Sequence, residues 1–296
     1  MTTITEYRYT TEDVEYLRHG DKSLVARIFT PEGDGPFPAV VELHGGAWAR
    51  GDRLQEKNRH EALAKAGIVV AALEFRQGRE GAYPKGIADI NYAVRWVKAN
   101  AKKLKTRPKQ VAISGQSSGG HLAMLVAMRP KDPRYTEIAL PAGSPAVDAT
   151  VRCVAMSWPV INPVGRYRHA KRAAAGADKP TWPLELISGQ DAFWQNEANM
   201  TEGSPTLALE RGEKLTLPPA LWIQTRNDQA HDYHDQDSSY PGTEAPRFAE
   251  AYKKAGGEID LVYYDVPARF TSIDPTSAAS KDAFGRFVAF FQKHCR

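Results

Sequence analysis

Cysteine is scarce in this chain of 296 residues, which has only Cys153 and Cys295. Cys153 stands in an apolar run, and Cys295 is the last residue but one. Disulfide scaffolds use several pairs, and cysteine metal sites place their ligands at short, regular spacings. The sequence therefore predicts neither a disulfide framework nor a metal site, and it favours a reducing compartment.

Long apolar runs and blocks of like charge are also missing. No stretch approaches the ~20 apolar residues of a membrane span, and the segment MTTITEYRYTTEDVEY lacks the basic start and apolar core of a signal peptide. The net charge is +4 with dispersed basic residues, whereas nucleic-acid-binding domains usually carry a basic stripe. We expect a cytoplasmic protein with no membrane or nucleic-acid partner. Its oligomeric state stays open, a homodimer included.

Short β-branched runs instead alternate with longer helical patterns along the whole chain. Strands are predicted at residues 24–29, 39–43, 68–75, 111–114, 151–157, 220–224 and 260–264. Helices are predicted at residues 55–66, 87–101, 119–128, 245–255 and 277–294. Strands that are apolar throughout and separated by helices indicate a mostly parallel sheet buried on both faces. We predict one α/β domain over residues 1–296, with a central sheet flanked by helices.

Two stretches fit this alternation poorly. Residues 162–217 separate two predicted strands, and residues 229–244 are strongly polar. Insertions at the carboxyl ends of parallel strands tend to line the ligand site. Residues 162–217 are therefore a candidate cap, with ordinary surface loops as the alternative.

The motif Gly115-Gln116-Ser117-Ser118-Gly119 lies between a predicted strand and a predicted helix. This is the G-x-S-x-G turn in its required context, and only Ser117 has both flanking glycines. A side chain at either glycine is expected to collide with neighbouring segments. We predict that Ser117 is a nucleophile.

A second motif, His44-Gly45-Gly46-Ala47-Trp48, directly follows a predicted strand. Ester hydrolysis requires N–H donors aimed at the carbonyl oxygen as it becomes an oxyanion. The predicted donors are the N–H of Ser118 together with those of Gly45 and Gly46, or of Gly46 and Ala47. His44 is expected to brace the loop by a hydrogen bond.

These blocks resemble the HGG-bearing carboxylesterases of the α/β-hydrolase fold, in the hormone-sensitive-lipase and feruloyl-esterase-like groups. The stretches HGGAWARGDR, AYPKGIADINYAVRWVKANA and GQSSGG carry the resemblance, which runs from about residue 22 to the C-terminus. It implies cofactor-free hydrolysis of a carboxylic ester through an acyl-enzyme, or of a formamide in some members. It leaves the substrate open.

The resemblance also implies an acid after one late strand and a histidine after the next. Asp228 occupies the acid position, with Asp232 as the weaker candidate. The histidine position, two residues before Phe270, is held by Ala268. The base that the resemblance requires is therefore missing at the expected place.

Three explanations remain open for the missing base. The chain is an inactive variant with alanine in place of histidine, or His231 or His234 serves as base, or the protein is a catalytically silent binder of a ligand. The spacing of His231 and His234 also invites a metal site, but no third ligand accompanies them.

The substrate is expected to be a small-molecule ester, bearing a carboxylate or an aryl group. Trp48, Trp158 and Trp194 are candidates to line an acyl or aryl pocket. Arginines near strand ends suit a carboxylate, and they are Arg50, Arg53, Arg76, Arg79, Arg226 and Arg269.

Overall fold

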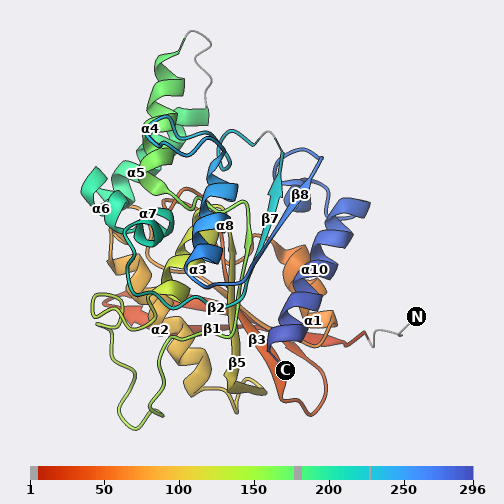
Figure 1. Cartoon of the computed structure of the whole chain (residues 1–296). Coiled ribbons are helices and arrows are strands. Elements are labelled where there is room, and N and C mark those ends of the chain that lie inside the picture. The colour runs from red at the N-terminus through yellow and green to blue at the C-terminus, as the bar shows by residue number, and fades with distance from the viewer. Residues whose placement is uncertain (1–5, 177–181, 227, 296) are drawn as a thin grey trace.

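The computed structural model describes residues 6–176, 182–226 and 228–295. The strands of this part of the chain form one sheet in the order β1-β2-β4-β3-β5-β6-β7-β8 (Figure 1). β3 to β8 pair in parallel, whereas β1 and β2 pair antiparallel with their neighbours. The bounds are β1 (Tyr9–His19), β2 (Lys22–Pro31), β3 (Phe37–Leu43), β4 (Val69–Leu73), β5 (Thr106–Gln116), β6 (Val154–Ser157), β7 (Ala220–Thr225) and β8 (Ile259–Tyr264).

Helices cover both faces of this sheet. The larger apolar layer packs under α2, α3 and α8, and the smaller one under α1 and α10. The helices are α1 (Lys57–Lys65), α2 (Lys85–Ala99), α3 (Ser118–Met128), α4 (Pro163–Ala175), α5 (Trp182–Trp194), α6 (Glu197–Glu202), α7 (Pro205–Glu210), α8 (Glu244–Lys254), α9 (Phe270–Ile273) and α10 (Ala278–His294).

Side chains of the central strands alternate between the two layers. In β3, Val41 and Leu43 enter the larger layer and Val40 enters the smaller one. All three are at most 1% exposed, so strands that read as continuous apolar runs are buried on both faces. The predicted α/β class with a mostly parallel sheet is confirmed. β1 was not predicted because this edge strand is largely exposed and polar, and it is held mainly by backbone pairing with β2.

The insertion between β6 and β7 is helical. It contains α4, α5, α6 and α7, and in Figure 1 α4 and α5 project from the body of the molecule at the top of the view. Residues 177–181 of the expected cap lie outside the described residues.

The two cysteines meet in the smaller apolar layer. Their Sγ atoms are 3.7 Å apart, and both residues are fully buried free thiols. This proximity could not be predicted from the sequence, because 141 residues separate the two positions. Within the described segments, no helix combines the length and apolar character needed to cross a bilayer.

Candidate active site

Ser117 sits in the sharp turn between β5 and α3. Its backbone angles are φ 49° and ψ −121°, a strained conformation for a residue with a side chain. The strain is held by two hydrogen bonds. The Ser117 N–H donates to the Ser157 carbonyl (2.9 Å), and the Ser117 carbonyl accepts from the Val160 N–H (3.1 Å).

The flanking glycines are required by close contacts. A Cβ at Gly119 would lie 2.3 Å from the His44 carbonyl oxygen, and one at Gly115 would lie 2.5 Å from the Gly119 backbone. The predicted collisions are confirmed. These contacts bring the turn directly against the end of β3, where the HGG loop begins.

The HGG loop lines the same cavity as Ser117 through Gly45, Gly46 and Ala47. Gly46 has φ 118°, and a Cβ there would lie 1.9 Å from the Arg50 carbonyl oxygen, so the loop needs glycine at this position. Ser118 is the first residue of α3, where the backbone N–H has no partner within the helix. The candidate donors therefore surround the serine.

His44 braces this loop from below. Its Nδ1 lies 2.7 Å from the Gly45 carbonyl oxygen, and its ring stacks on Phe75 at 4.5 Å. Burial lowers the pKa of His44 to about 4, despite the opposing effect of the Gly45 carbonyl. The imidazole is therefore neutral near pH 7 and donates its Nδ1–H to the loop.

His231 and Asp228 complete a chain of hydrogen bonds with Ser117. His231 Nε2 lies 2.9 Å from Ser117 Oγ, and Nδ1 lies 2.9 Å from each carboxylate oxygen of Asp228. Burial alone raises the pKa of Asp228, but the charge and hydrogen bond of His231 and backbone N–H groups outweigh it. The pKa of Asp228 therefore lies below its usual value, and the carboxylate is ionised.

Ser117 has a histidine partner, His231, although Ala268 stands where the resemblance places the histidine. The loop after β7 folds back at once, because the Asp228 carbonyl accepts the N–H groups of His231 (3.1 Å) and Asp232 (2.8 Å). A histidine three residues after the acid thus returns beside it. Of the two alternatives considered, His231 faces the serine, whereas His234 is exposed with Nδ1 on the Gly242 carbonyl (3.0 Å).

Ala268 lies elsewhere, in the turn between β8 and α9. It is partly buried and does not line the cavity that holds Ser117, although Arg269 and Ser272 from the same segment do. Position 268 is therefore not the place of the histidine in this chain. The space beside Ser117 Oγ is already taken by the His231 ring.

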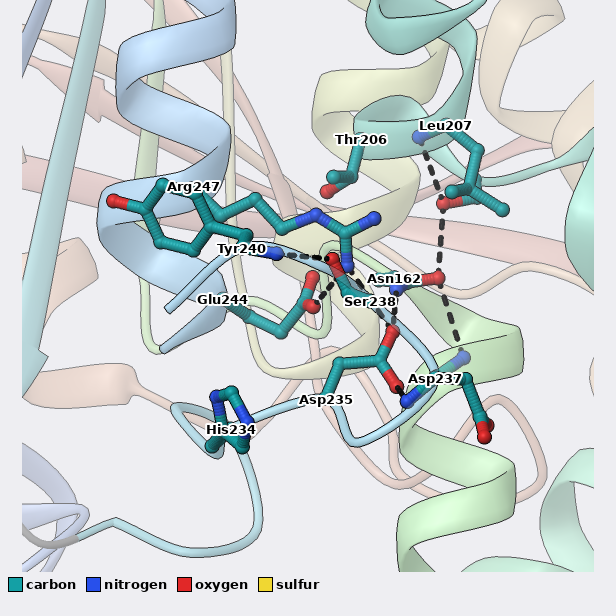
Figure 2. A network of polar contacts seen from close by, with 12 residues as sticks. Asn162, Thr206, Leu207, His234, Asp235, Asp237, Ser238, Tyr240, Glu244 and Arg247 are labelled. Carbon is teal, nitrogen blue, oxygen red and sulfur yellow. Dashed lines mark hydrogen bonds and ion pairs between the residues drawn. The ribbon is translucent and has the colours of Figure 1, made fainter. Parts of the chain in front are cut away.

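The loop that carries His231 is tied to the insertion and to α8. Tyr233 is buried, donates its hydroxyl to the Asn162 carbonyl (3.2 Å) and stacks on His169 of α4 at 4.5 Å. Figure 2 shows Asp235 between Arg247 of α8 (3.1 Å) and the Asn162 amide (3.4 Å). The insertion therefore helps to hold the loop in place.

The cavity beside Ser117 measures about 370 Å³, and apolar atoms contribute more of its lining than polar atoms do. Its lining residues are Gly45, Gly46, Ala47, Arg50, Gln55, Glu56, Gln116, Ser117, Trp158, Leu186, His231, Arg269 and Ser272. Leu186 comes from α5, so the insertion contributes to the wall.

Two predicted substrate contacts are wrong. Trp48 and Trp194 are at most 1% exposed and pack edge to face at 5.5 Å. The Trp48 indole N–H donates to His121 (3.2 Å). Both tryptophans belong to the core beneath the insertion. Of the other candidate contacts, Trp158, Arg50 and Arg269 border the cavity.

Within residues 6–176, 182–226 and 228–295, no three histidine, cysteine or acidic side chains lie close enough together to hold a metal ion. His231 contacts Ser117 and Asp228, whereas His234 contacts the Gly242 carbonyl.

The fold and the serine turn define an α/β-hydrolase, and residues 27–234 match the BD-FAE family. The chain belongs to this family. Esterase LipC of Mycobacterium tuberculosis is 26% identical over 258 residues, which cover 86% of this chain and 58% of LipC. Carboxylic ester hydrolase LipN of the same organism is 32% identical over 250 residues, which cover 80% of this chain and 58% of LipN. The chain thus spans less than two thirds of the length of these curated relatives.

Solved structures show the same fold. An esterase from Pyrobaculum calidifontis superposes with a TM-score of 0.74 at 23% identity, over 98% of this chain and 87% of that one. The thermostable carboxylesterase EstE1, cloned from a metagenomic library, superposes with a TM-score of 0.73 at 23% identity, over 100% of this chain and 92% of EstE1. The likeness covers the whole central sheet and its helices.

Proposed function

We propose that this chain is a serine carboxylic-ester hydrolase that works through an acyl-enzyme on Ser117, with His231 as base and Asp228 as its partner. The observation that supports this most is the unbroken set of 2.9 Å contacts from Ser117 through His231 to Asp228, beside the HGG loop. This proposal replaces those of an inactive variant and of a silent binding protein.

In the first half-reaction, Ser117 Oγ attacks the ester carbonyl carbon and His231 Nε2 takes the hydroxyl proton. The carbonyl π electrons move to oxygen, where the N–H of Ser118 and those of Gly45 and Gly46 donate to the oxyanion. The tetrahedral intermediate collapses, and the leaving alcohol takes the proton from His231. Water then attacks the acyl-enzyme by the same steps, which releases the acid and restores Ser117.

Asp228 holds the His231 ring with Nδ1–H toward the carboxylate, so that Nε2 is free to accept a proton. The carboxylate also stabilises the imidazolium that forms in each half-reaction. The lowered pKa of Asp228 suits this role, because the group stays charged throughout the neutral range.

The substrate we propose is a small ester, with residues 162–217 acting as a partial cap. Leu186 brings the insertion to the cavity, whereas Trp158 borders the cavity with only 1% of its surface exposed. The volume of about 370 Å³ suits a small ester better than one with a long acyl chain.

Hydrolysis of p-nitrophenyl acetate by the wild-type chain and by Ser117→Ala tests the proposal. Turnover by the wild type alone, with phosphonylation of Ser117 by an organophosphate seen by mass spectrometry, is the expected result. Faster cleavage of an N-formyl arylamine than of the ester would instead assign an arylformamidase. Absence of both turnover and labelling would reject the proposal.

A further inference from the structure

The segment after β8, where the resemblance places the base, contributes a cation to the cavity. Arg269 stands there with φ 58°, a left-handed conformation that is unusual for a residue with a side chain. It is exposed and lines the cavity with Ser117 and His231. Among the described residues, no carboxylate lies within ion-pair distance of its guanidinium group.

A second cation enters the same cavity from the HGG loop. Arg50 lines it and pairs with Glu185 of α5 at 2.8 Å. The two side chains are 59% and 67% exposed, so solvent screens this pair and it holds Arg50 only weakly. Arg50 is therefore available to a ligand at little cost.

The acidic residue of the cavity does not cancel these charges. The Glu56 side chain is only 3% exposed and lies 3.5 Å from the Arg59 guanidinium group. Its carboxylate also accepts hydrogen bonds from Thr271 and Ser272. Glu56 is thus engaged within the protein, and the charged groups that the cavity presents to solvent are Arg50 and Arg269.

Two other candidate arginines near the strand ends are occupied by carboxylates. Arg53 pairs with Asp13 and Glu74, and Arg76 pairs with Asp89. Arg269 differs from Arg53 and Arg76 because it lines the cavity and they do not.

We propose that the site takes an ester that carries a second, anionic group, and that Arg269, assisted by Arg50, binds this group. The inference rests on the proposed ester hydrolysis. A carboxylate is the simplest such group, because a planar guanidinium donates two parallel hydrogen bonds to it. Arg269 is then a specificity-determining residue, carried by the segment that is freed from supplying the base.

Two matched pairs of esters test this, and they separate an anion on the alcohol side from one on the acyl side. The first pair is 4-acetoxybenzoate and 4-acetoxybenzamide, and the second is monomethyl glutarate and its carboxamide analogue. In one of the pairs, we expect kcat/KM to be about tenfold higher for the carboxylate, as a charge-assisted hydrogen bond predicts. Arg269→Gln should abolish that preference, mainly through KM, and added salt should weaken it.

Arg226→Gln is the matched control. Arg226 is also an exposed arginine at this edge of the sheet, but it pairs with Asp265 at 3.0 Å and does not line the cavity. Arg226→Gln should leave the ratio of kcat/KM between the carboxylate and carboxamide esters unchanged. Equal turnover of carboxylate and carboxamide in both pairs would overturn the inference while leaving ester hydrolysis intact.

A binding measurement separates this inference from failure of the proposed chemistry. Titration of Ser117→Ala with 4-hydroxybenzoate and with 4-hydroxybenzamide in a calorimeter needs no turnover. Tighter binding of the carboxylate, lost in the Ser117→Ala/Arg269→Gln double variant, supports an anion site even if no ester is cleaved. The same titration with glutarate and glutaramic acid tests the acyl side. If the carboxylate ligand binds no more tightly than its carboxamide in either set, the anion site is rejected.

Discussion

Replacing His231 by alanine should remove nearly all turnover of p-nitrophenyl acetate. The ring is in place before substrate arrives, with Nε2 2.9 Å from Ser117 Oγ and Nδ1 2.9 Å from both oxygens of Asp228. Without it, only substrate binding and the N–H donors remain to promote the reaction. Loss of a triad histidine lowers kcat by about 10⁴- to 10⁶-fold, which corresponds to about 5 to 8 kcal/mol of transition-state stabilisation. KM should change little, because the ring is used mainly in the chemical steps.

Two companion variants make this prediction specific. His234→Ala changes the exposed histidine three residues further along the same loop, and it should leave kcat unchanged. Ala268→His places an imidazole at the position expected from sequence, but residue 268 does not line the cavity, so no gain is expected. If His231→Ala keeps more than about a hundredth of the activity, or if Ala268→His restores activity to His231→Ala, the base has been assigned wrongly.

Three further predictions follow from the site and its supports. Gly46→Ala should lower kcat by about 10²-fold with the fold retained by circular dichroism, since its Cβ would meet the backbone 1.9 Å away; an unchanged kcat would remove this loop from the mechanism. Asp235→Asn should lower the free energy of unfolding in urea by about 1 to 2 kcal/mol and also lower kcat. Asp237 is exposed in the same loop, and Asp237→Asn should change neither quantity. Equal effects of the two variants would contradict a positioning role for Asp235. Burial lowers the pKa of His44 to about 4 and that of His121 to about 3. Because the folded protein then binds fewer protons than the unfolded chain, stability should fall as pH drops from about 6.5 toward 4; a flat urea midpoint between pH 7.5 and 5 would exclude it.

The sequence was sufficient for the parts of the site that depend on local backbone geometry. The glycines of both motifs stand where a side chain would collide, so Ser117 and the HGG loop could be recognised without knowing their surroundings. Asp228 followed from the resemblance to the carboxylesterases, which places the acid directly after a late strand. These features are local, because each is fixed by a strand and the turn that follows it.

The features that the sequence did not reveal depend on tertiary contacts. His231 reaches Ser117 across 114 positions, and nothing in a polar loop shows which of two histidines will turn inward. The two histidines differ in burial, since His231 is buried and His234 is exposed. Tyr233 and Asp235, which flank His234, are buried, whereas His234 itself points outward. Trp48 and Trp194 were misjudged for the same reason, because aromatic residues near a site do not show whether they face the cavity or the core.

In the proposed mechanism, acid and base lie on one short loop, and this changes which other parts of the fold must position the triad. When the base follows a later strand, the geometry of the triad depends on how that strand pairs with the sheet. Here both side chains depend on the turn at Asp228 and on the contacts of Tyr233 and Asp235 with Asn162. The segment after β8 is thereby released from the chemistry and supplies Arg269 and Ser272 to the cavity wall. Substitutions after β8 should therefore alter which ester is preferred, while substitutions of Asp228, His231, Tyr233 or Asp235 should alter the rate for every ester alike. Comparing the two groups of variants on the carboxylate and carboxamide esters tests this division of roles, and a rate loss common to all esters after Arg269→Gln would contradict it.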